Sequence, residues 1–420
     1  MTQPDAEGAL PGLSTRAVHA GAPEARPGEP LVSPVAQTAT FFTDPVPTGE
    51  VLYSRYGTNP NHLAVSRKLA ALEGAEAALV LASGMAAESM ALLACADVAD
   101  GAGGAGGAGA GAGWRRHVVA QAELYGGTVQ LLRHDLPALG IDTTFMQDGD
   151  DWDAAIRPET CALYVELPVN PTMRVPDFEA VAAAAARHEL PLLVDATFAT
   201  PINFRPLEHG ATLSIHSATK YLGGHSDLSA GMVAGPAALV ERVRQKMKSF
   251  GGMIDPHAAW LLERGMKTLA IRVQRQNASA LALAQWLESH PAVARVHYPG
   301  LESHPDHARA CRLLDGFGGM LAIVVHGGDD AALRVCGRLR LVRVAPSLGG
   351  VESLVSMPRY TSHASLTRTQ RLEAGIDDGF IRLSVGIEDA ADLRADLEQA
   401  LVPEAAPARE ATVTADPRSG

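Results

Sequence analysis

Residues 214–225 read Ser214-Ile215-His216-Ser217-Ala218-Thr219-Lys220-Tyr221-Leu222-Gly223-Gly224-His225. Lys220 follows a short apolar segment and is flanked by hydroxyl residues and a glycine pair. Burial lowers the pKa of a lysine and frees its amine to attack an aldehyde, so this setting suits a lysine that forms a Schiff base with pyridoxal 5'-phosphate (PLP). The alternative is a lysine that ends a strand and points to solvent, as most lysines do.

A second apolar run, Leu190 to Asp195, ends in a carboxylate. The run predicts a buried parallel strand, and open α/β sheets place their ligands at the carboxyl edge of such strands. A carboxylate there would keep the pyridine nitrogen of PLP protonated. The alternative is that Asp195 caps a helix, but Thr197, Thr200 and Pro201 indicate a loop.

The cofactor phosphate has a candidate site upstream. Residues 77–82 predict a strand, Ser83-Gly84-Met85 a tight turn and residues 86–95 a helix. Backbone N–H groups at the start of that helix would face an anion, and Ser217 and Thr219 could add hydroxyl donors. Strand, turn and helix form a common α/β unit, so this signal alone is weak.

Tyr125 offers an aromatic face for the cofactor ring. Gly126 and Gly127 follow it and would allow close approach. Taken singly, Tyr125 is better explained as a packing residue.

A series of short motifs stands in one order along the chain: Tyr53-Ser54-Arg55, Ser83-Gly84-Met85, Leu124-Tyr125-Gly126-Gly127-Thr128, Glu166 with Asn170-Pro171, Asp195, Ser217 to Lys220, Ser347-Leu348-Gly349-Gly350-Val351-Glu352-Ser353-Leu354, and Arg382-Leu383-Ser384-Val385-Gly386. Together they resemble the PLP-dependent Cys/Met metabolism (trans-sulfuration) family, which includes cystathionine γ-synthase, cystathionine γ-lyase, methionine γ-lyase and the O-acylhomoserine sulfhydrylases. The resemblance runs from about Ser14 to about Leu401.

The resemblance implies catalytic and substrate roles. Lys220 would be the Schiff-base lysine and would later move protons between Cα, Cβ and the leaving group. Asp195 would pair with the pyridinium nitrogen, and Tyr125 would stack on the ring and assist release of the γ-substituent. Arg382 would clamp the substrate carboxylate in a bidentate pair, with Ser347 positioning that carboxylate and the lysine.

It also implies how the cofactor is held. Asn170 would lie near the cofactor O3′ and near the substrate. Tyr53 and Arg55 would reach the phosphate from a neighbouring subunit, which makes the active site a property of a homo-oligomer, expected as a dimer of dimers. The residues that would bind the phosphate from their own subunit are Ser83, Gly84, Met85, Ser217 and Thr219.

Some positions depart from the family pattern. One extra residue follows Arg55, so that loop is expected to run differently. Leu52 and Pro346 replace acids that many cystathionine-handling members carry, which casts doubt on recognition of the distal ammonium of cystathionine. Gly127 replaces the cysteine of methionine γ-lyases, as in the cystathionine enzymes, so these clues point in opposite directions.

Composition favours a cytoplasmic enzyme. The chain has 420 residues, of which 47% are hydrophobic, and a net charge of -12, which argues against nucleic acid or an anionic membrane as the main partner. Residues 1–13 lack a signal peptide, and no apolar run is long enough to span a bilayer. The cysteines have neither metal-ligand spacing nor the density of a disulfide framework: Cys95, Cys161, Cys311 and Cys336.

The chain is expected to form an α/β structure of PLP-dependent transferase fold type I, aspartate aminotransferase-like, in which a parallel-rich sheet is wrapped by helices and a smaller C-terminal α/β domain follows. Residues 255–289 predict one helix, and residues 320–325 and 379–386 predict strands of the smaller domain. The predicted divisions are an N-terminal arm (1–65), a large PLP-binding domain (66–260) with a Gly/Ala insertion (101–113), a C-terminal domain (261–402) and a disordered tail (403–420).

Two further patterns were weighed. Gly101, Gly103 and Gly106 match a dinucleotide-binding fingerprint, but the segment follows a helix and opens none, so a flexible insertion is favoured over an NAD site. The histidines His297, His304 and His307 could suggest a metal cluster, but no cysteine or acidic pair completes it. They are interpreted as surface loop residues, and no metal is expected.

The sequence therefore predicts γ-replacement or γ-elimination on homoserine-derived or thioether amino acids in sulfur amino-acid metabolism. A cystathionine γ-synthase-like reaction of an O-acylhomoserine with a thiol is favoured, with cystathionine γ-lyase or methionine γ-lyase as the alternative. Gly127 and the stretches 252–257 and 265–269 look more like the synthases. A non-catalytic homologue is disfavoured because it would not need Lys220 together with Asp195.

Overall fold

The computed structural model describes residues 11–24, 26–98, 113–364 and 366–402. A seven-stranded sheet has the order β1-β9-β8-β7-β6-β4-β5, and a five-stranded sheet has the order β10-β11-β14-β13-β12. In the large sheet only β9 runs antiparallel to its neighbours. The strands are β1 (Ala77–Leu81), β2 (Asp97–Val98), β3 (Gly113–Trp114), β4 (His117–Gln121), β5 (Asp142–Met146), β6 (Thr160–Glu166), β7 (Leu192–Asp195), β8 (Leu213–His216), β9 (Gly231–Gly235), β10 (Val293–His297), β11 (Met320–Val325), β12 (Arg343–Val344), β13 (Leu354–Ser356) and β14 (Phe380–Ser384).

Helices cover both faces of the large sheet. Alternate residues of β4 show this: Val118 packs in the core with α3 and α9, whereas Val119 packs in the core with α7. The parallel strands β4, β6 and β7 are buried along their whole length, as expected between two helical layers. The α-helices are α1 (Leu13–His19), α2 (Pro60–Glu73), α3 (Gly84–Ala96), α4 (Gly126–Gln130), α5 (Leu136–Ala138), α6 (Trp152–Ala155), α7 (Phe178–Arg187), α8 (Thr200–Asn203), α9 (Ala237–Phe250), α10 (Pro256–Met266), α11 (Leu269–Glu288), α12 (His307–Leu313), α13 (Gly328–Arg338), α14 (Arg368–Glu373) and α15 (Ala390–Leu401).

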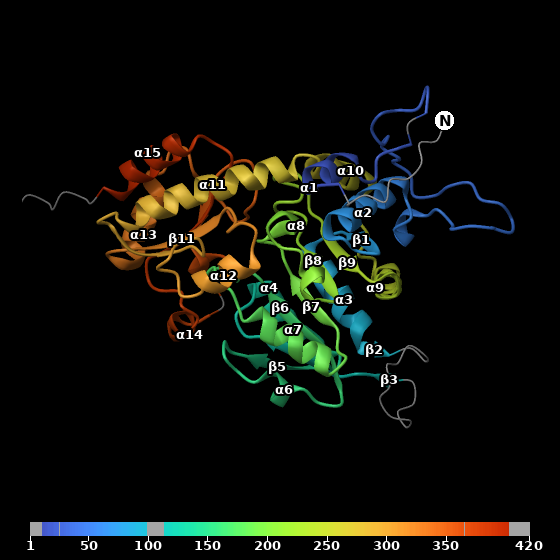
Figure 1. Cartoon of the computed structure of the whole chain (residues 1–420), viewed down its shortest axis with the longest axis horizontal. Coiled ribbons are helices and arrows are strands. Elements are labelled where there is room, and N and C mark those ends of the chain that lie inside the picture. Colours follow the sequence, from blue (N-terminus) through green and yellow to red (C-terminus); the bar gives the residue numbers. More distant parts are fainter. Residues whose placement is uncertain (1–10, 25, 99–112, 365, 403–420) are drawn as a thin grey trace, which may run out of the picture.

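The small sheet lies beside the large one, and the long α11 runs across the top of the small sheet and reaches the large domain (Figure 1). Its central strands β11 and β14 are fully buried, and α11, α13 and α15 contribute to the same core. This parallel-rich sheet with a second, smaller α/β unit confirms the predicted fold class.

The predicted single helix over residues 255–289 is wrong, because α10 ends at Met266 and α11 begins at Leu269. At this break the Arg272 side chain forms two hydrogen bonds to backbone carbonyls. The carbonyl of Gly265 accepts a hydrogen bond from Arg272 Nη2 (2.9 Å), and Arg272 Nη1 donates to the Tyr221 carbonyl (2.8 Å). The break thus ties α11 to the segment that carries Lys220.

The N-terminal segment is not wholly extended, because it contains α1 and the start of α2. After Tyr53 the chain forms a short 3₁₀ helix, Ser54–Tyr56, which ends at Gly57 in a left-handed conformation. The Gly/Ala insertion lies outside the described residues except for its last residue, and β2 and β3 pair antiparallel at its two ends. The tail 403–420 lies outside them too. Among the described helices, none has both the length and the apolar character needed to cross a membrane.

Candidate active site

The carboxyl ends of the parallel strands meet at one edge of the large sheet, where Glu166 ends β6, Asp195 ends β7 and β8 leads to Lys220. A cavity of about 740 Å³ opens there. The small domain contributes Ser347 and Arg382 to its wall. The predicted site residues that line this cavity are Ser83, Gly84, Met85, Tyr125, Asn170, Asp195, Ser217, Thr219, Lys220, Ser347 and Arg382.

Asp195 is buried at 5% exposure. Its Oδ1 accepts hydrogen bonds from the Thr197 N–H (2.9 Å) and hydroxyl (2.5 Å), whereas Oδ2 has no donor among the described residues. Burial raises the pKa of the Asp195 carboxyl, and the Thr197 hydrogen bonds oppose that rise. A buried carboxyl with one free oxygen at a cavity wall fits a cationic ring nitrogen such as that of PLP.

Lys220 is partly buried beside two charged groups. Burial lowers the pKa of the Lys220 amine, the positive charge of Arg382 lowers it further, and Asp195 acts in the opposite direction. Each effect has the expected sign, because low dielectric and a like charge disfavour the ammonium form. The cavity therefore contains an amine that is easier to deprotonate than a surface lysine.

Arg382 is held in a fixed orientation inside the protein. The side chain is 6% exposed, and Nη1 donates to Asn170 Oδ1 (2.8 Å) while Nη2 donates to the Ser347 carbonyl (3.3 Å). Burial lowers the pKa of Arg382 to about 10, so the guanidinium stays charged at neutral pH. It offers a preoriented cation to an anionic group in the cavity.

Glu166 ties two walls of the cavity together. Its Oε2 accepts the backbone N–H of Tyr125 (2.7 Å), and its Oε1 accepts that of Asn170 (2.8 Å). Burial, with the nearby charge of Asp195, holds the pKa of Glu166 well above its ordinary value. This carboxyl positions the loops of Tyr125 and Asn170.

The part of the cavity wall formed by the start of α3 suits a phosphate. The predicted turn at residues 83–85 is the start of α3 itself, because Ser83 is the N-cap and its Oγ accepts the Ala86 N–H (3.1 Å). A Cβ added to Gly84 would lie 2.8 Å from Ser217 Cβ, so only glycine permits this close approach. Helix N–H groups and the Ser217 hydroxyl therefore meet at one place. The Thr219 hydroxyl, by contrast, donates to the Ala230 carbonyl (3.2 Å).

Tyr125 is 41% exposed and lies on the cavity wall at the start of α4. A Cβ added to Gly127 would lie 2.6 Å from Tyr125 Cε1 and 3.0 Å from Met85 Sδ. The absence of a side chain at Gly127 thus leaves the space that the Tyr125 ring and Met85 occupy.

Tyr53 and Arg55 do not line this cavity. Arg55 Nη1 donates to the Lys248 carbonyl (2.9 Å), and its guanidinium lies over the rings of Tyr53 (5.7 Å) and Tyr56 (5.1 Å). Within the described chain these residues belong to the arm and not to the cavity.

Sequence reasoning missed Glu88 and the role of Thr197. Glu88 lines the cavity, is 3% exposed and accepts a hydrogen bond from the Thr128 hydroxyl (2.6 Å). Burial, reinforced by Asp195, raises the pKa of Glu88 to about 8. An acid in the otherwise apolar run of α3 was the available signal.

The interpretation of the histidines as surface loop residues is wrong for His297 and His304. His297 belongs to β10 and packs against the Phe380 ring, and both side chains are buried. Among the described residues, no group of three or more His, Cys, Asp or Glu side chains is placed to hold a metal ion.

Comparisons with known proteins agree with this geometry. The family model of the Cys/Met metabolism PLP-dependent enzymes matches residues 14–402. The chain is 41% identical to L-methionine gamma-lyase of Pseudomonas putida, over 93% of this chain and 98% of that protein. It is 41% identical to cystathionine gamma-lyase of Bacillus subtilis, over 83% and 88%.

Synthases are similar as well. Chloroplastic cystathionine gamma-synthase 1 of Arabidopsis thaliana is 38% identical over 88% of this chain, which spans 65% of that protein's length. The crystal structure of metB from Corynebacterium glutamicum superimposes with a TM-score of 0.84 at 35% identity, over 93% of this chain and 98% of that one.

Proposed function

This chain belongs to the Cys/Met metabolism PLP-dependent enzymes, and from that premise we propose that it performs γ-replacement on a homoserine-derived amino acid, joining an O-acylhomoserine to a thiol. The family makes the chain a PLP-dependent trans-sulfuration enzyme, either a γ-synthase or a carbon–sulfur lyase. The observation that carries the proposal is that one cavity brings together the Lys220 amine, the Asp195 carboxyl and the Arg382 guanidinium from two separate sheets.

When bound, PLP withdraws electrons from the substrate α-carbon. Lys220 would hold the cofactor covalently and would then move protons at Cα, Cβ and the leaving group. The lowered pKa of its amine supports this role, because a base must be free of its proton to accept another. Asp195 would pair with the ring nitrogen and keep it protonated.

Arg382 binds the substrate α-carboxylate. Its bonds to Asn170 and to the Ser347 carbonyl already fix the plane of the guanidinium, which leaves its remaining N–H groups for a carboxylate. Ser347 has a φ of +145°, a conformation that few non-glycine residues adopt. This backbone strain at the carbonyl that holds Arg382 supports a functional role for residue 347.

The phosphate would be held by Ser83, Gly84, Met85 and Ser217 of the same chain and by Tyr53 and Arg55 of a second copy, whereas the Thr219 hydroxyl is bonded to the Ala230 backbone. The position of the arm supports this division, because Tyr53 and Arg55 lie outside their own cavity. The working unit is accordingly a dimer or a pair of dimers, and the large domain (66–260) and C-terminal domain (261–402) together build each cavity.

Replacement is favoured over elimination by the residues around the substrate. The space beside Gly127 is occupied by the Tyr125 ring and Met85. By the family resemblance, methionine γ-lyases carry a cysteine at this position. Pro346 lines the cavity and carries no charge for the distal ammonium of cystathionine as a donor, which favours an acyl-activated homoserine as the donor. The second candidate, a γ-lyase acting on methionine or cystathionine, is supported by the 41% identity to lyases from two bacteria.

The test is product analysis with purified holoenzyme. We expect O-succinylhomoserine or O-acetylhomoserine with cysteine to give cystathionine faster than either ester gives 2-oxobutanoate, measured by mass spectrometry. Methionine and cystathionine are supplied in parallel. If 2-oxobutanoate from methionine or cystathionine is the fastest product, the chain is a γ-lyase and the replacement proposal is wrong.

A further inference from the structure

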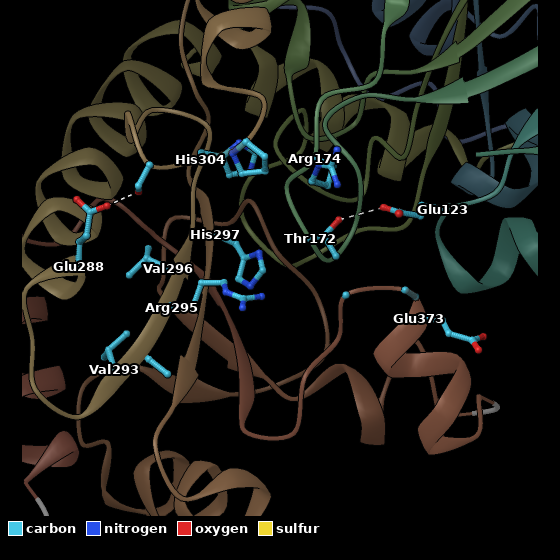
Figure 2. Close-up of a pocket in the computed structure, with 15 residues that line it drawn as sticks. Glu123, Thr172, Arg174, Glu288, Val293, Arg295, Val296, His297, His304 and Glu373 are labelled. Atoms are coloured by element: carbon cyan, nitrogen blue, oxygen red, sulfur yellow. Dashed lines mark hydrogen bonds between the residues drawn. The ribbon is translucent and has the colours of Figure 1, made fainter. Parts of the chain in front are cut away.

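A second cavity, of about 500 Å³, lies apart from the Lys220 site (Figure 2). Arg295 and His297 of β10 lie on one side of it, and Glu123 and Thr172 of the large domain lie on the other. None of its lining residues lines the Lys220 cavity. The full lining is Glu123, Thr172, Arg174, Glu288, Val293, Ala294, Arg295, Val296, His297, Ser303, His304, Pro305, Glu373, Ala374 and Gly375.

His297 is an unsatisfied polar group at this cavity. Its side chain is 9% exposed, and its Nε2 has no hydrogen-bond partner among the described residues. Burial, with the positive charge of Arg295, lowers the pKa of His297 to about 4, so the ring is neutral and can donate one N–H. The Nε2 atom is itself enclosed by the protein, so the neutral ring adds no charge to this wall and the charged groups beside it decide which ligand fits.

The charges of the wall limit the class of ligand. Glu123, Glu288 and Glu373 would repel a polyanion, whereas Arg174 and Arg295 would repel a simple cation. Arg174 is bound to Asp306 (2.5 Å), and Arg295 is bound to Asp377 (3.2 Å) but is largely exposed. A small molecule that carries one charge of each sign matches this wall.

We propose that this cavity binds a free α-amino acid, whose carboxylate is bound by Arg295 beside the neutral His297 ring and whose ammonium faces Glu123. Among the described residues, the partly buried Glu123 accepts one long hydrogen bond, from Thr172 (3.4 Å). Burial raises the pKa of the Glu123 carboxyl, and the positive charge of Arg174 lowers it, so a further cation would favour its charged form. Val293 and Val296 provide an apolar wall for a side chain such as that of methionine.

The site is connected to the catalytic cavity through two short segments. Glu123 lies two residues before Tyr125, and Thr172 lies two residues after Asn170. Glu166 binds the backbone N–H groups of both Tyr125 and Asn170. An amino acid whose ammonium faces Glu123 therefore lies beside the segments that carry Tyr125 and Asn170, and its effect on the catalytic cavity and the effect of a substrate on its own binding are reciprocal.

The experiment measures binding, so it does not depend on which reaction the enzyme performs. Holoenzyme is reduced with borohydride, so that its cofactor can no longer exchange with added amines, and L-methionine is titrated by calorimetry. An Arg382→Ala variant treated in the same way removes the carboxylate clamp of the catalytic cavity. We expect this variant to keep one methionine site per chain.

Cavity variants locate that site. Arg295→Ser removes the proposed carboxylate partner, and Ala294→Trp fills the cavity from an exposed position, so neither disturbs the core. Each should weaken methionine binding about tenfold or more. The matched control is Arg334→Ser, an exposed arginine on α13, which should leave binding unchanged.

Two analogues test the ligand class. Both 4-(methylthio)butanoate, which lacks the ammonium, and 3-(methylthio)propylamine, which lacks the carboxylate, should bind about tenfold more weakly than methionine. The proposal is overturned if Arg382→Ala abolishes all methionine binding, if the cavity variants bind as well as wild type, or if one analogue binds as tightly as methionine.

Discussion

The candidate catalytic site has two regions that differ in how they are built. The interior region, with Asp195, Glu166 and Arg382, is at most 6% exposed and each charged group is held by hydrogen bonds. The arm region, with Tyr53 and Arg55, rests on surface contacts outside the cavity. The buried groups that need fixed positions are thus held by contacts within one chain. The arm residues do not line that cavity, so in our proposal they complete the site of a second copy.

The largest expected effect is at Lys220, because the interior region should lose its catalytic activity without this side chain. Lys220→Ala should lower kcat by a factor of about 10³ or more, since both the covalent link and the proton carrier are lost. Borohydride reduction followed by mass spectrometry should find cofactor mass on wild type only.

The matched control is Lys248→Ala, an arm-side lysine near the Tyr56 ring, which should keep the covalent cofactor. A Lys220→Ala protein that still carries reduced cofactor would place the link on another residue and disprove the assignment.

Glu88 tests whether burial governs the interior region. Its folded-state pKa is raised to about 8 from 4.5, so the folded state binds more protons than the unfolded state between these values. The stabilisation is complete below pH 4.5 and is lost as pH rises through 8. Glu88→Gln removes this titration, so its stability relative to wild type should increase by roughly 2 to 4 kcal/mol between pH 5 and pH 8.

Urea unfolding of both holoenzymes at the two pH values measures this change. Glu373→Gln, at an exposed position, provides the control and should track wild type. Parallel stability curves for Glu88→Gln and wild type would mean that the buried carboxyl does not titrate as inferred.

Local sequence signals predicted the catalytic residues of the interior region, but they did not predict the residues that hold those residues in place. The apolar run before Asp195 predicted a buried strand, the setting of Lys220 predicted a lysine with a lowered pKa, and both residues line the cavity. Glu88 was missed because its partners, Thr128 and Asp195, come from distant segments that only the fold brings together. The break at Lys267 was missed for the same reason, since Tyr221 holds Arg272 across 51 positions in the sequence.

The arm region is tested by mixing subunits. If Arg55 serves the neighbour's phosphate, inactive Lys220→Ala and inactive Arg55→Ala subunits should form hybrid dimers in which one site has both residues. Random exchange then restores about a quarter of wild-type sites, because half of the dimers are hybrids and each has one complete site.

Activity is measured after subunit exchange has been verified by native mass spectrometry of differently tagged chains. A Lys220→Ala, Arg55→Ala double variant mixed with wild type gives the control, since its hybrids gain no complete site. Hybrids that remain inactive would show that each site is built from a single chain.

The smallest expected effect concerns the charge near the arm. Leu52 and Pro346 offer no carboxylate to the distal ammonium of cystathionine, and an unpaired charge taken from water costs several kcal/mol. Glu50, the nearest acid in sequence, is already paired with Arg244 (2.5 Å). Leu52→Glu should therefore raise kcat/KM for cystathionine relative to methionine about tenfold, equivalent to about 1.4 kcal/mol.

Leu52→Gln, which matches size without charge, should leave the ratio unchanged. Equal ratios in the Glu and Gln variants would mean that residue 52 does not face the substrate of either subunit, and the arm would then contribute to phosphate binding alone.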